Sequence, residues 1–516
     1  MHLRSRGLVA ILRYRQGKAN PAGIEAHPTK ASQGLWLRNP PHVIRRPLST
    51  FLNNSSPGTV EIPSTGQRSA LARLKHLVGL DRAVAYSVLA RGWTAVVQLV
   101  TITLIARRLS PVEQGFYYTF GSLVNLQIVF ELGFSSVILQ LAAHEAAHLT
   151  IHASGQIEGP AQHHQRLASV FRKAMKWYTT AAILMACFLI PVGWRFFSTS
   201  SSNTGAVHWQ LPMICVVLAS SITFQIDPIF SFLEGCGYVA NVQRTRLAQS
   251  ILAGLLGWTA LLLHHGLFAP ALIISGQAIA GIVWVASKRG LIFHLLRHPI
   301  TQHAVDWWKE VWPFQWRIAV SYACGYFIFQ LFNPILFRYW GAVEAGRMGM
   351  SITVCNGIAN IAIAWINTKA APFGSMIARK EYAGLDRVFF RSVAQTVGLT
   401  SIGSLIVWSV AFWLDAHHLR LAQRILPPLP LGMMLISMNI NQVVSSMALY
   451  LRAHKQEKFL LNSVLGAIFL SLSCWFLGRA YGALGMASGQ LSIGIVLGLG
   501  LGSWTFFHYR RLWHEA

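Results

Sequence analysis

The chain has 516 residues, of which 53% are hydrophobic and 12% charged, and its mean hydropathy is +0.44. Soluble domains typically carry about 25% charged residues, so the composition excludes an ordinary soluble protein and indicates lipid as the solvent. The net charge of +26 would suit nucleic acid, but Lys and Arg are dispersed between apolar runs instead of gathering with aromatics on one face. We therefore predict an integral membrane protein without a nucleic-acid partner.

Residues 1–80 differ from the rest of the chain. They are basic, poor in acidic residues and rich in Pro, Ser and Asn, and they lack a sustained apolar run. This composition predicts a disordered tail. It equally fits an organelle transit peptide or an upstream extension from a misplaced start codon, but not a secretory signal.

Window hydropathy and charge punctuation predict about twelve transmembrane helices from Ala83 onward, and hence an all-α polytopic membrane protein. The expected spans are 84–106, 114–140, 177–197, 209–234, 246–265, 267–287, 316–338, 347–370, 390–414, 428–451, 459–478 and 482–507. The six cysteines stand singly within these apolar segments, without metal-ligand spacing, and we expect neither a metal nor a cofactor.

The basic residues of the connections predict the orientation. With a cytoplasmic amino terminus, the inner segments hold twenty Lys and Arg residues and the outer segments eight. Because short cytoplasmic loops carry an excess of Lys and Arg, we expect both termini in the cytoplasm.

The sequence contains an internal repeat. Arg107 with Val112-Glu113-Gln114-Gly115 is matched, with the same internal spacing, by Arg338 with Val343-Glu344-Ala345-Gly346, and Val170-Phe171-Arg172 is echoed by Val388-Phe389-Phe390-Arg391. Six spans separate the copies, so the halves share one orientation. The pattern predicts two pseudo-symmetric six-helix bundles, over 83–287 and 316–510, joined by a cytoplasmic linker over 288–315.

Four charged residues fall within predicted spans: Arg91, Glu131, Asp227 and Lys369. A charge at the bilayer centre costs about 2.5–3.5 kcal/mol on insertion scales, so each requires a partner or a water-filled cavity. The alternative for each is snorkelling at a span end or a structural ion pair.

Two further features concern binding. Pro228 follows Asp227 and is expected to break the helix, freeing carbonyl groups beside a carboxylate, as suits a proton or cation site. Arg317 starts the seventh span, where its guanidinium fork suits the phosphate oxygens of an anionic headgroup or acts as an interfacial anchor.

The segment His144-Glu145-Ala146-Ala147-His148 has the spacing of a zinc-protease helix, with two imidazoles on one face and Glu as the base. No acidic third ligand follows at a family spacing, and the segment leads into a His-rich loop. We find no phosphate-binding Gly loop, nucleophile elbow or catalytic triad, and we do not expect an enzyme.

Three stretches resemble a known family: Ile105–Tyr117, Glu131–Phe134 with Gln140, and Phe232-Leu233-Glu234-Gly235. The first two resemble the opening hairpin of bacterial polysaccharide flippases. These are the O-antigen and teichuronic-type exporters of the multidrug, oligosaccharidyl-lipid and polysaccharide exporter superfamily. The likeness covers roughly residues 83–510, and the chain departs from it in the long tail and in the His-rich loop from His144 to His164.

The resemblance implies a flippase that moves an undecaprenyl-pyrophosphate-linked oligosaccharide across the inner membrane by alternating access, for cell-surface polysaccharide synthesis beside polymerase and ligase machinery. On this hypothesis Arg91, Arg317 and Lys369 attract the pyrophosphate, and Asp227 with Glu131 binds a coupling H+ or Na+. Two alternatives remain open within membrane transport and proteolysis: a multidrug cation antiporter of the same superfamily and a membrane-embedded zinc protease. A third, a glycan polymerase or ligase, would require a large outer loop, and every outer connection here is short.

Overall fold

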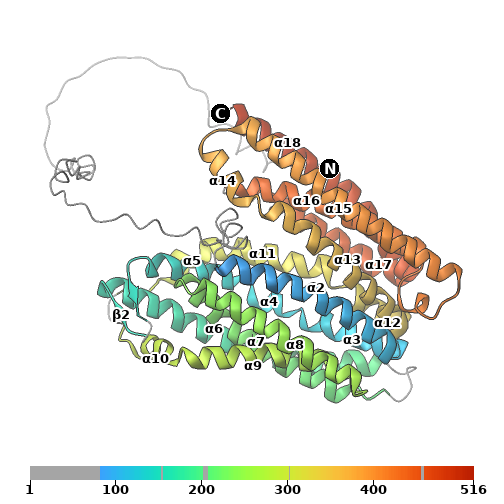
Figure 1. The fold of residues 1–516 in the computed structure, drawn as a ribbon, viewed down its shortest axis with the longest axis horizontal. Helices are drawn as coiled ribbons and strands as arrows, with labels where there is room; N and C mark the ends of the chain where they lie inside the picture. Colours follow the sequence, from blue (N-terminus) through green and yellow to red (C-terminus); the bar gives the residue numbers. More distant parts are fainter. Residues whose placement is uncertain (1–81, 153–154, 201–206, 301–302, 455–457, 516) are drawn as a thin grey trace, which may run out of the picture. The chain divides into compact units, whose positions relative to one another are not determined.

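A computed structural model describes residues 82–152, 155–200, 207–300, 303–454 and 458–515 (Figure 1). The predicted tail over 1–80 lies outside the described residues. We call the helix ends that carry the cation-rich connections the inner end, and the opposite ends the outer end. The first half denotes residues 82–287 and the second half residues 312–515.

The first half is built from helical spans that alternate in direction, some of them formed by more than one helix. They are α2 (Arg82–Arg108), α3 (Pro111–Val124), α4 (Gln127–Glu131), α5 (Phe134–Ala146), α6 (Ala161–Ser200), α7 (Gln210–Gly235), α8 (Val239–Leu262), η1 (Gly266–Phe268) and α9 (Ala269–Ser287). α3 begins at a capping box, in which the Ser110 hydroxyl accepts from the Glu113 amide and the Glu113 carboxylate accepts from the Ser110 amide. α3 to α5 form one span bent by 44° at Leu132-Gly133, where both residues have positive φ.

The second half repeats this arrangement. It contains α11 (Trp312–Phe329), α12 (Phe332–Trp340), α13 (Ala342–Asn367), α14 (Ala370–Ala378), α15 (Tyr382–Ala416), η3 (Ala422–Arg424), α16 (Pro428–Ala453), α17 (Leu460–Ile493), η4 (Gly494–Leu501) and α18 (Gly502–Glu515). Figure 1 shows α15, α16, α17 and α18 as one group of helices at the carboxyl end of the chain.

The helical stretch from Leu460 to Glu515 is two antiparallel helices and not one. Gly482 has φ 60° and ψ −140°, a conformation that residues with a Cβ rarely adopt. A Cβ at Gly485 would lie 2.7 Å from the carbonyl carbon of Leu477, and one at Gly489 would lie 3.1 Å from the Cβ of Ser473. Along a straight helix the last two residues would be about 24 Å apart, so the chain reverses at Gly482.

The described helices account for the predicted spans. Eight are long and apolar enough to cross a bilayer, or nine with the bent α3–α5 pair. Two more helices, α2 and α8, are 27 and 24 residues long but more polar, and the final stretch divides into two at Gly482. With these, the part of the chain that the structure describes makes twelve passages. Each passage coincides with one predicted span, and the all-α polytopic fold is confirmed.

The two halves also match in their packing. α2 packs on α8 as α11 and α12 pack on α17, and α6 packs on α7 as α15 packs on α16. Buried positions along α6 and α15 correspond in one constant register, each at most 2% exposed: Leu167/Leu385, Phe171/Phe389, Ala174/Ser392, Tyr178/Thr396 and Ala182/Thr400. This register pairs Lys173, rather than the Arg172 of the sequence echo, with Arg391.

The two copies of the sequence repeat meet each other at the outer end. α3 crosses α13 so closely that a Cβ at Gly115 would lie 2.5 Å from the carbonyl carbon of Ala342, and one at Gly346 would lie 2.9 Å from the amide nitrogen of Gly115. The Gln114 amide donates to the carbonyl oxygens of Gly346 and Arg424, both at 2.9 Å. The repeated glycines therefore allow the halves to contact backbone to backbone.

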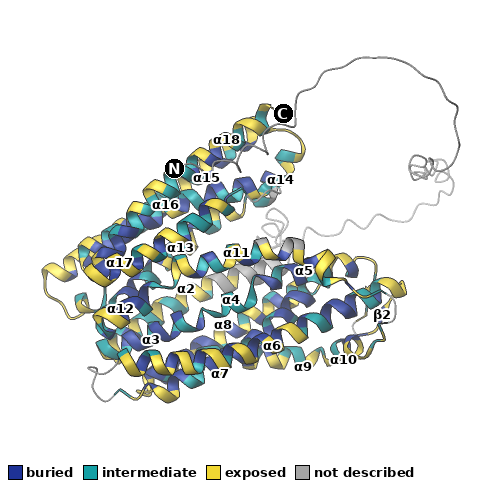
Figure 2. Ribbon diagram, turned by 180° about the vertical axis from the view of Figure 1, so that it is seen from behind, coloured by how far each residue is buried: buried dark blue, intermediate teal, exposed yellow. Residues whose placement is uncertain are grey.

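Many large apolar side chains are exposed on the helical surface, and Figure 2 shows exposed positions along most of the helices. On α15, for example, Leu405 is 65% exposed and Ile402 59% exposed. Such an apolar exterior is stable in hydrocarbon and not in water, as a membrane-spanning bundle requires.

The connections at the inner end are structured. In the His-rich loop, β1 (Thr150–Ile151) pairs antiparallel with β2 (Ile157–Glu158). The linker contains the amphipathic helix α10 (Arg289–Arg297) and a π-helical turn, η2 (Trp307–Val311), and it is held against α6. Arg172 donates to the carbonyl oxygens of Leu295 and His298, and Lys173 donates to that of Val305.

Candidate functional site

The structure brings two predicted carboxylates into one region of the first half. Glu131 ends α4 just before the bend, and Asp227 lies half-buried on α7. The fully buried Tyr178 of α6 lies within electrostatic range of both carboxylates, and its hydroxyl hydrogen-bonds to Ser135 at 2.9 Å. Within the described part of the chain, neither carboxylate forms a salt bridge with a cationic side chain.

Arg246 is a further member of this group that the sequence did not suggest. It interacts electrostatically with Asp227, and its guanidinium carbon lies 5.8 Å from the centroid of the Phe230 ring. Arg246 stands at the start of the predicted fifth span, so we counted it among the cations of the inner segments. α8 begins earlier, at Val239, which places Arg246 inside the helix.

The predicted helix break at Pro228 is wrong. α7 runs without interruption from Gln210 to Gly235 with Pro228 buried inside it. Proline removes a single backbone donor, and a transmembrane helix packed on both sides tolerates that loss. The carboxylate of Asp227 therefore lies beside an intact helix, and unwound carbonyl groups do not contribute to any cation site there.

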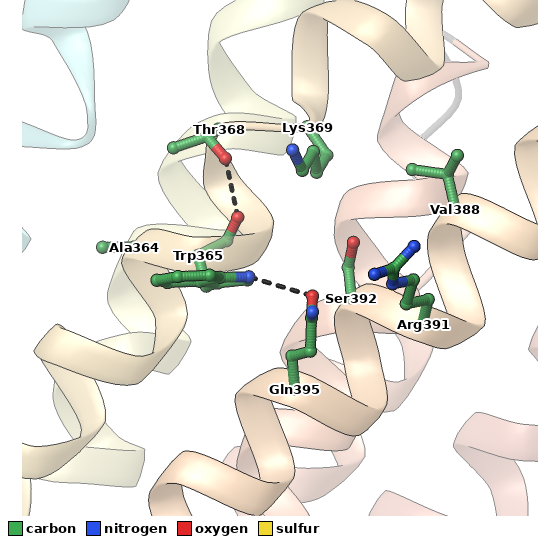
Figure 3. A pocket seen from close by; sticks show the side chains of 8 residues that line it. All are labelled: Ala364, Trp365, Thr368, Lys369, Val388, Arg391, Ser392 and Gln395. Carbon is green, nitrogen blue, oxygen red and sulfur yellow. Dashed lines mark hydrogen bonds between the residues drawn. The ribbon is translucent and has the colours of Figure 1, made fainter.

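The predicted cations lie in different places. Arg91 is on α2 and Arg317 on α11, but their side chains fall outside the described residues. Lys369 is the N-cap residue of α14 and lines a cavity of about 630 Å³ between the inner ends of α13 and α15. Figure 3 shows this cavity and the side chains around it.

The cavity contains a second cation, Arg391, which was predicted only as an inner-segment residue. The Trp365 indole donates to the Gln395 side-chain oxygen at 2.9 Å and forms a wall, and Ala364 and Val388 add apolar surface. Figure 3 shows Arg391 and Lys369 facing the same space. Among the described residues, neither cation forms a salt bridge with a carboxylate. Sequence spacing alone did not reveal this pair, because α14 and a reversal of the chain separate its members.

The nearest carboxylate on α15 is already engaged. Asp386, with its side chain 16% exposed, accepts from the Arg510 guanidinium and from the Tyr450 hydroxyl at 3.1 Å. His514 lies 3.6 Å from the same carboxylate. Asp386 thus joins α15, α16 and α18 at the inner end, leaving the cavity cationic.

The zinc-protease motif forms a structural ion pair instead of a free base. The Glu145 side chain is 3% exposed and contacts His163 and Arg166, both at 2.7 Å, and Arg166 also binds Glu310 at 2.5 Å. This pairing holds the pKa of Glu310, which lies outside the spans, below its usual value. The described residues contain no group of three or more His, Cys, Asp or Glu placed to bind a metal. Through Arg166, Glu145 therefore links α5 and α6 to η2 in the linker.

The sequence matches no protein-family model, and no curated protein matches it either. Solved structures of membrane transporters do share this fold, and one of them is described as a member of the MOP superfamily. The chain is similar to an inward-facing multidrug resistance MATE family transporter of that superfamily (TM-score 0.56, 12% identity, 82% of this chain and 99% of that one). It is also similar to the lipid II flippase MurJ in an inward closed conformation (0.52, 14%, 81% and 86%) and to the eukaryotic MATE transporter AtDTX14 (0.53, 11%, 86% and 99%).

At these identities the likeness establishes the fold. The superfamily and the polysaccharide-exporter subtype suggested by the sequence both stay predictions. The roles predicted for the cations and carboxylates also stay predictions; the residues are Arg91, Arg317, Lys369, Asp227 and Glu131. The structure does bring Asp227 and Glu131 near Tyr178. It also places Lys369 and Arg391 in the lining of one cavity.

Proposed function

We propose that the chain is a transporter that flips an anionic lipid-linked oligosaccharide, of the undecaprenyl-pyrophosphate type, across the inner membrane by alternating access. The observation that carries the proposal is the uneven division of charge. The carboxylates Glu131 and Asp227 lie in the first half, whereas the cavity of the second half holds Lys369 and Arg391 without a carboxylate partner among the described residues. A cationic cavity favours a pyrophosphate, and a separate carboxylate pair suits a coupling cation.

Coupling would use repulsion between Glu131 and Asp227. Two carboxylates near one another are stabilised when a proton or Na+ lies between them, and Arg246 competes for Asp227 when that ion leaves. Loading and release of the ion then change the charge between α4, α7 and α8. Such a change can bias two arrangements of the halves, as alternating access requires.

The cellular setting follows from the cargo. The protein would lie in the inner membrane with both termini in the cytoplasm, and it would receive its cargo at the inner end and release it to polymerase and ligase machinery. The cation-rich connections support this orientation.

A multidrug cation antiporter is the second candidate. The carboxylates and the aromatic Tyr178 favour it, because organic cations bind carboxylates and ring faces. The cations of the second-half cavity oppose it, since they would repel such cargo.

Complementation of a flippase-deleted bacterial strain tests the proposal. The intact chain should restore surface polysaccharide, and Asp227→Asn should leave lipid-linked intermediate facing the cytoplasm. Asp415→Asn, an exposed carboxylate on α15, is the matched control and should behave like the intact chain. Failure of correctly inserted protein across several glycan types, together with drug resistance on expression, would favour the antiporter.

A second test addresses the headgroup role. Protein in vesicles is assayed for flipping with Arg91, Arg317 and Lys369 all replaced by Gln. Flipping at the unaltered rate would show that these cations do not attract the pyrophosphate.

A further inference from the structure

The two halves contain corresponding grooves, and in the first half the chain itself occupies the inner end of the groove, leaving a smaller cavity of about 210 Å³ beside Leu132 and Trp177. The register of the glycine repeat pairs Phe134 with Trp365, and the register of α6 with α15 pairs Lys173 with Arg391. In the first half, the Trp307 ring of η2 packs against Phe134 with centroids 4.9 Å apart and lies 5.9 Å from the Lys173 ammonium. The carbonyl oxygen of Val305 accepts from the same ammonium. The linker thus supplies both an apolar filler and an oxygen acceptor.

In the groove of the second half, the linker supplies neither an apolar side chain nor a carbonyl acceptor. The connecting helix α14 leaves a cavity of about 630 Å³ between α13 and α15, within the usual size range of ligand sites. Arg391 and Lys369 both face it (Figure 3), and no carboxylate pairs with either of them in the described part of the chain. Two like charges facing one cavity repel, so the arrangement favours an anionic occupant whose oxygens replace the carbonyl that Lys173 has.

The chemistry of the walls indicates the class of that anion. A guanidinium fork, an ammonium and the Ser392 hydroxyl can donate together to the oxygens of a phosphate group. Trp365, 52% exposed, offers an apolar face for the first carbons of a lipid chain. The cavity lies at the inner ends of the helices, the depth at which lipid headgroups lie. The residues before the first described helix, 1–81, contain twelve Lys and Arg against three acidic residues, so charge repulsion disfavours them as the occupant.

We infer that the groove between α13 and α15 is a binding site for a lipid-borne phosphate, with Arg391 and Lys369 as its ligands. The identity of the occupant rests on the proposed function: it is the pyrophosphate of the lipid-linked cargo as it enters from the inner leaflet. An anionic phospholipid offers the same chemistry with one phosphate, and the pair of cations favours the higher charge of pyrophosphate.

Binding to the full-length protein in phosphatidylcholine nanodiscs tests the inference. Undecaprenyl pyrophosphate, phosphatidylglycerol and inorganic pyrophosphate are titrated separately, with native mass spectrometry as the readout. Arg391→Gln and Lys369→Gln should each weaken binding of undecaprenyl pyrophosphate at least tenfold. Arg387→Gln, on the same helix one turn earlier and not lining the cavity, should leave it unchanged.

The outcomes separate the sources and the proposals. Tighter binding of undecaprenyl pyrophosphate than of phosphatidylglycerol supports the lipid-linked cargo as the occupant. Equal binding of both lipids that depends on Arg391 supports a general phospholipid site. Binding of both lipids that Arg391→Gln leaves unaltered overturns the site. Arg391-dependent binding without flipping in vesicles would retain the site and refute the transport proposal. Flipping that is indifferent to Arg391→Gln, with unaltered binding, would refute the site alone.

Discussion

Adding one methyl group at Gly115 should force the two halves apart at the outer end. In the structure a Cβ there would lie 2.5 Å from the carbonyl carbon of Ala342 and 2.8 Å from its Cα, whereas carbon atoms in contact prefer about 3.5–4.0 Å. Both obstacles are backbone atoms, so α3 and α13 must separate by about 1 Å or more. Overpacking of this kind costs about 1–3 kcal/mol. In the proposed alternating-access cycle, opening of the outer end separates α3 from α13, so Gly115→Ala should shift the population toward the open arrangement by about fivefold to 150-fold, at about 1.4 kcal/mol per factor of ten.

Labelling of a buried cysteine measures this shift. Ala345, fully buried beside the crossing, is replaced by Cys in a background without the six native cysteines, and its reaction with a membrane-impermeant maleimide is timed. Gly115→Ala should raise the labelling rate about fivefold or more. Gly121→Ala is the matched control, because it lies on the same helix and its Cβ would meet nothing within 4 Å. Equal rates in the two variants would refute the reasoning.

Three further changes probe the inner end. Arg166→Met leaves the buried Glu145 without its guanidinium, and a lost partner of a buried ion pair costs about 3–5 kcal/mol, so thermal stability should fall markedly. Asp386→Asn should release α18 from α15 and α16, which limited proteolysis at the carboxyl terminus would detect. Burial, together with the nearby His294 and Arg172, lowers the pKa of His298 below its ordinary 6.5. Neutral His298 therefore stabilises the docking of α10 above pH 6.5, and this contribution is lost as the pH falls below that value. Amide exchange of α10, corrected for the intrinsic rate, should therefore rise between pH 7.5 and 5.5, and less so in His298→Gln.

Each of these predictions has its own control. Lys176→Met removes an exposed cation from the same helix as Arg166 and should change stability little, and Asp415→Asn does the same for an exposed carboxylate at the outer end of α15. For α10, the nearby groups that also titrate are His164 on α6 and His294 on α10 itself. A pH dependence that His298→Gln leaves intact would assign the effect to those two histidines instead.

The sequence by itself determined the solvent, the number of passages and the duplication. Runs of about 20 apolar residues can satisfy their backbone groups in lipid only as helices, so hydropathy alone places nearly every span. The repeat at Gly115 and Gly346 was visible as a pattern. The structural role of these glycines could not be predicted, because the close contact of α3 with α13 joins residues from opposite halves of the chain.

Only the tertiary structure decided which charges meet. Glu145 looked like a catalytic base by its spacing, but His163 and Arg166 neutralise it across the loop. Arg391 looked like any cation of an inner segment, and its environment depends on the linker, which covers the groove of the first half and leaves that of the second open. A charge costs or gains free energy according to its neighbours within a few ångströms, and those neighbours come from helices whose separation along the chain carries no signal.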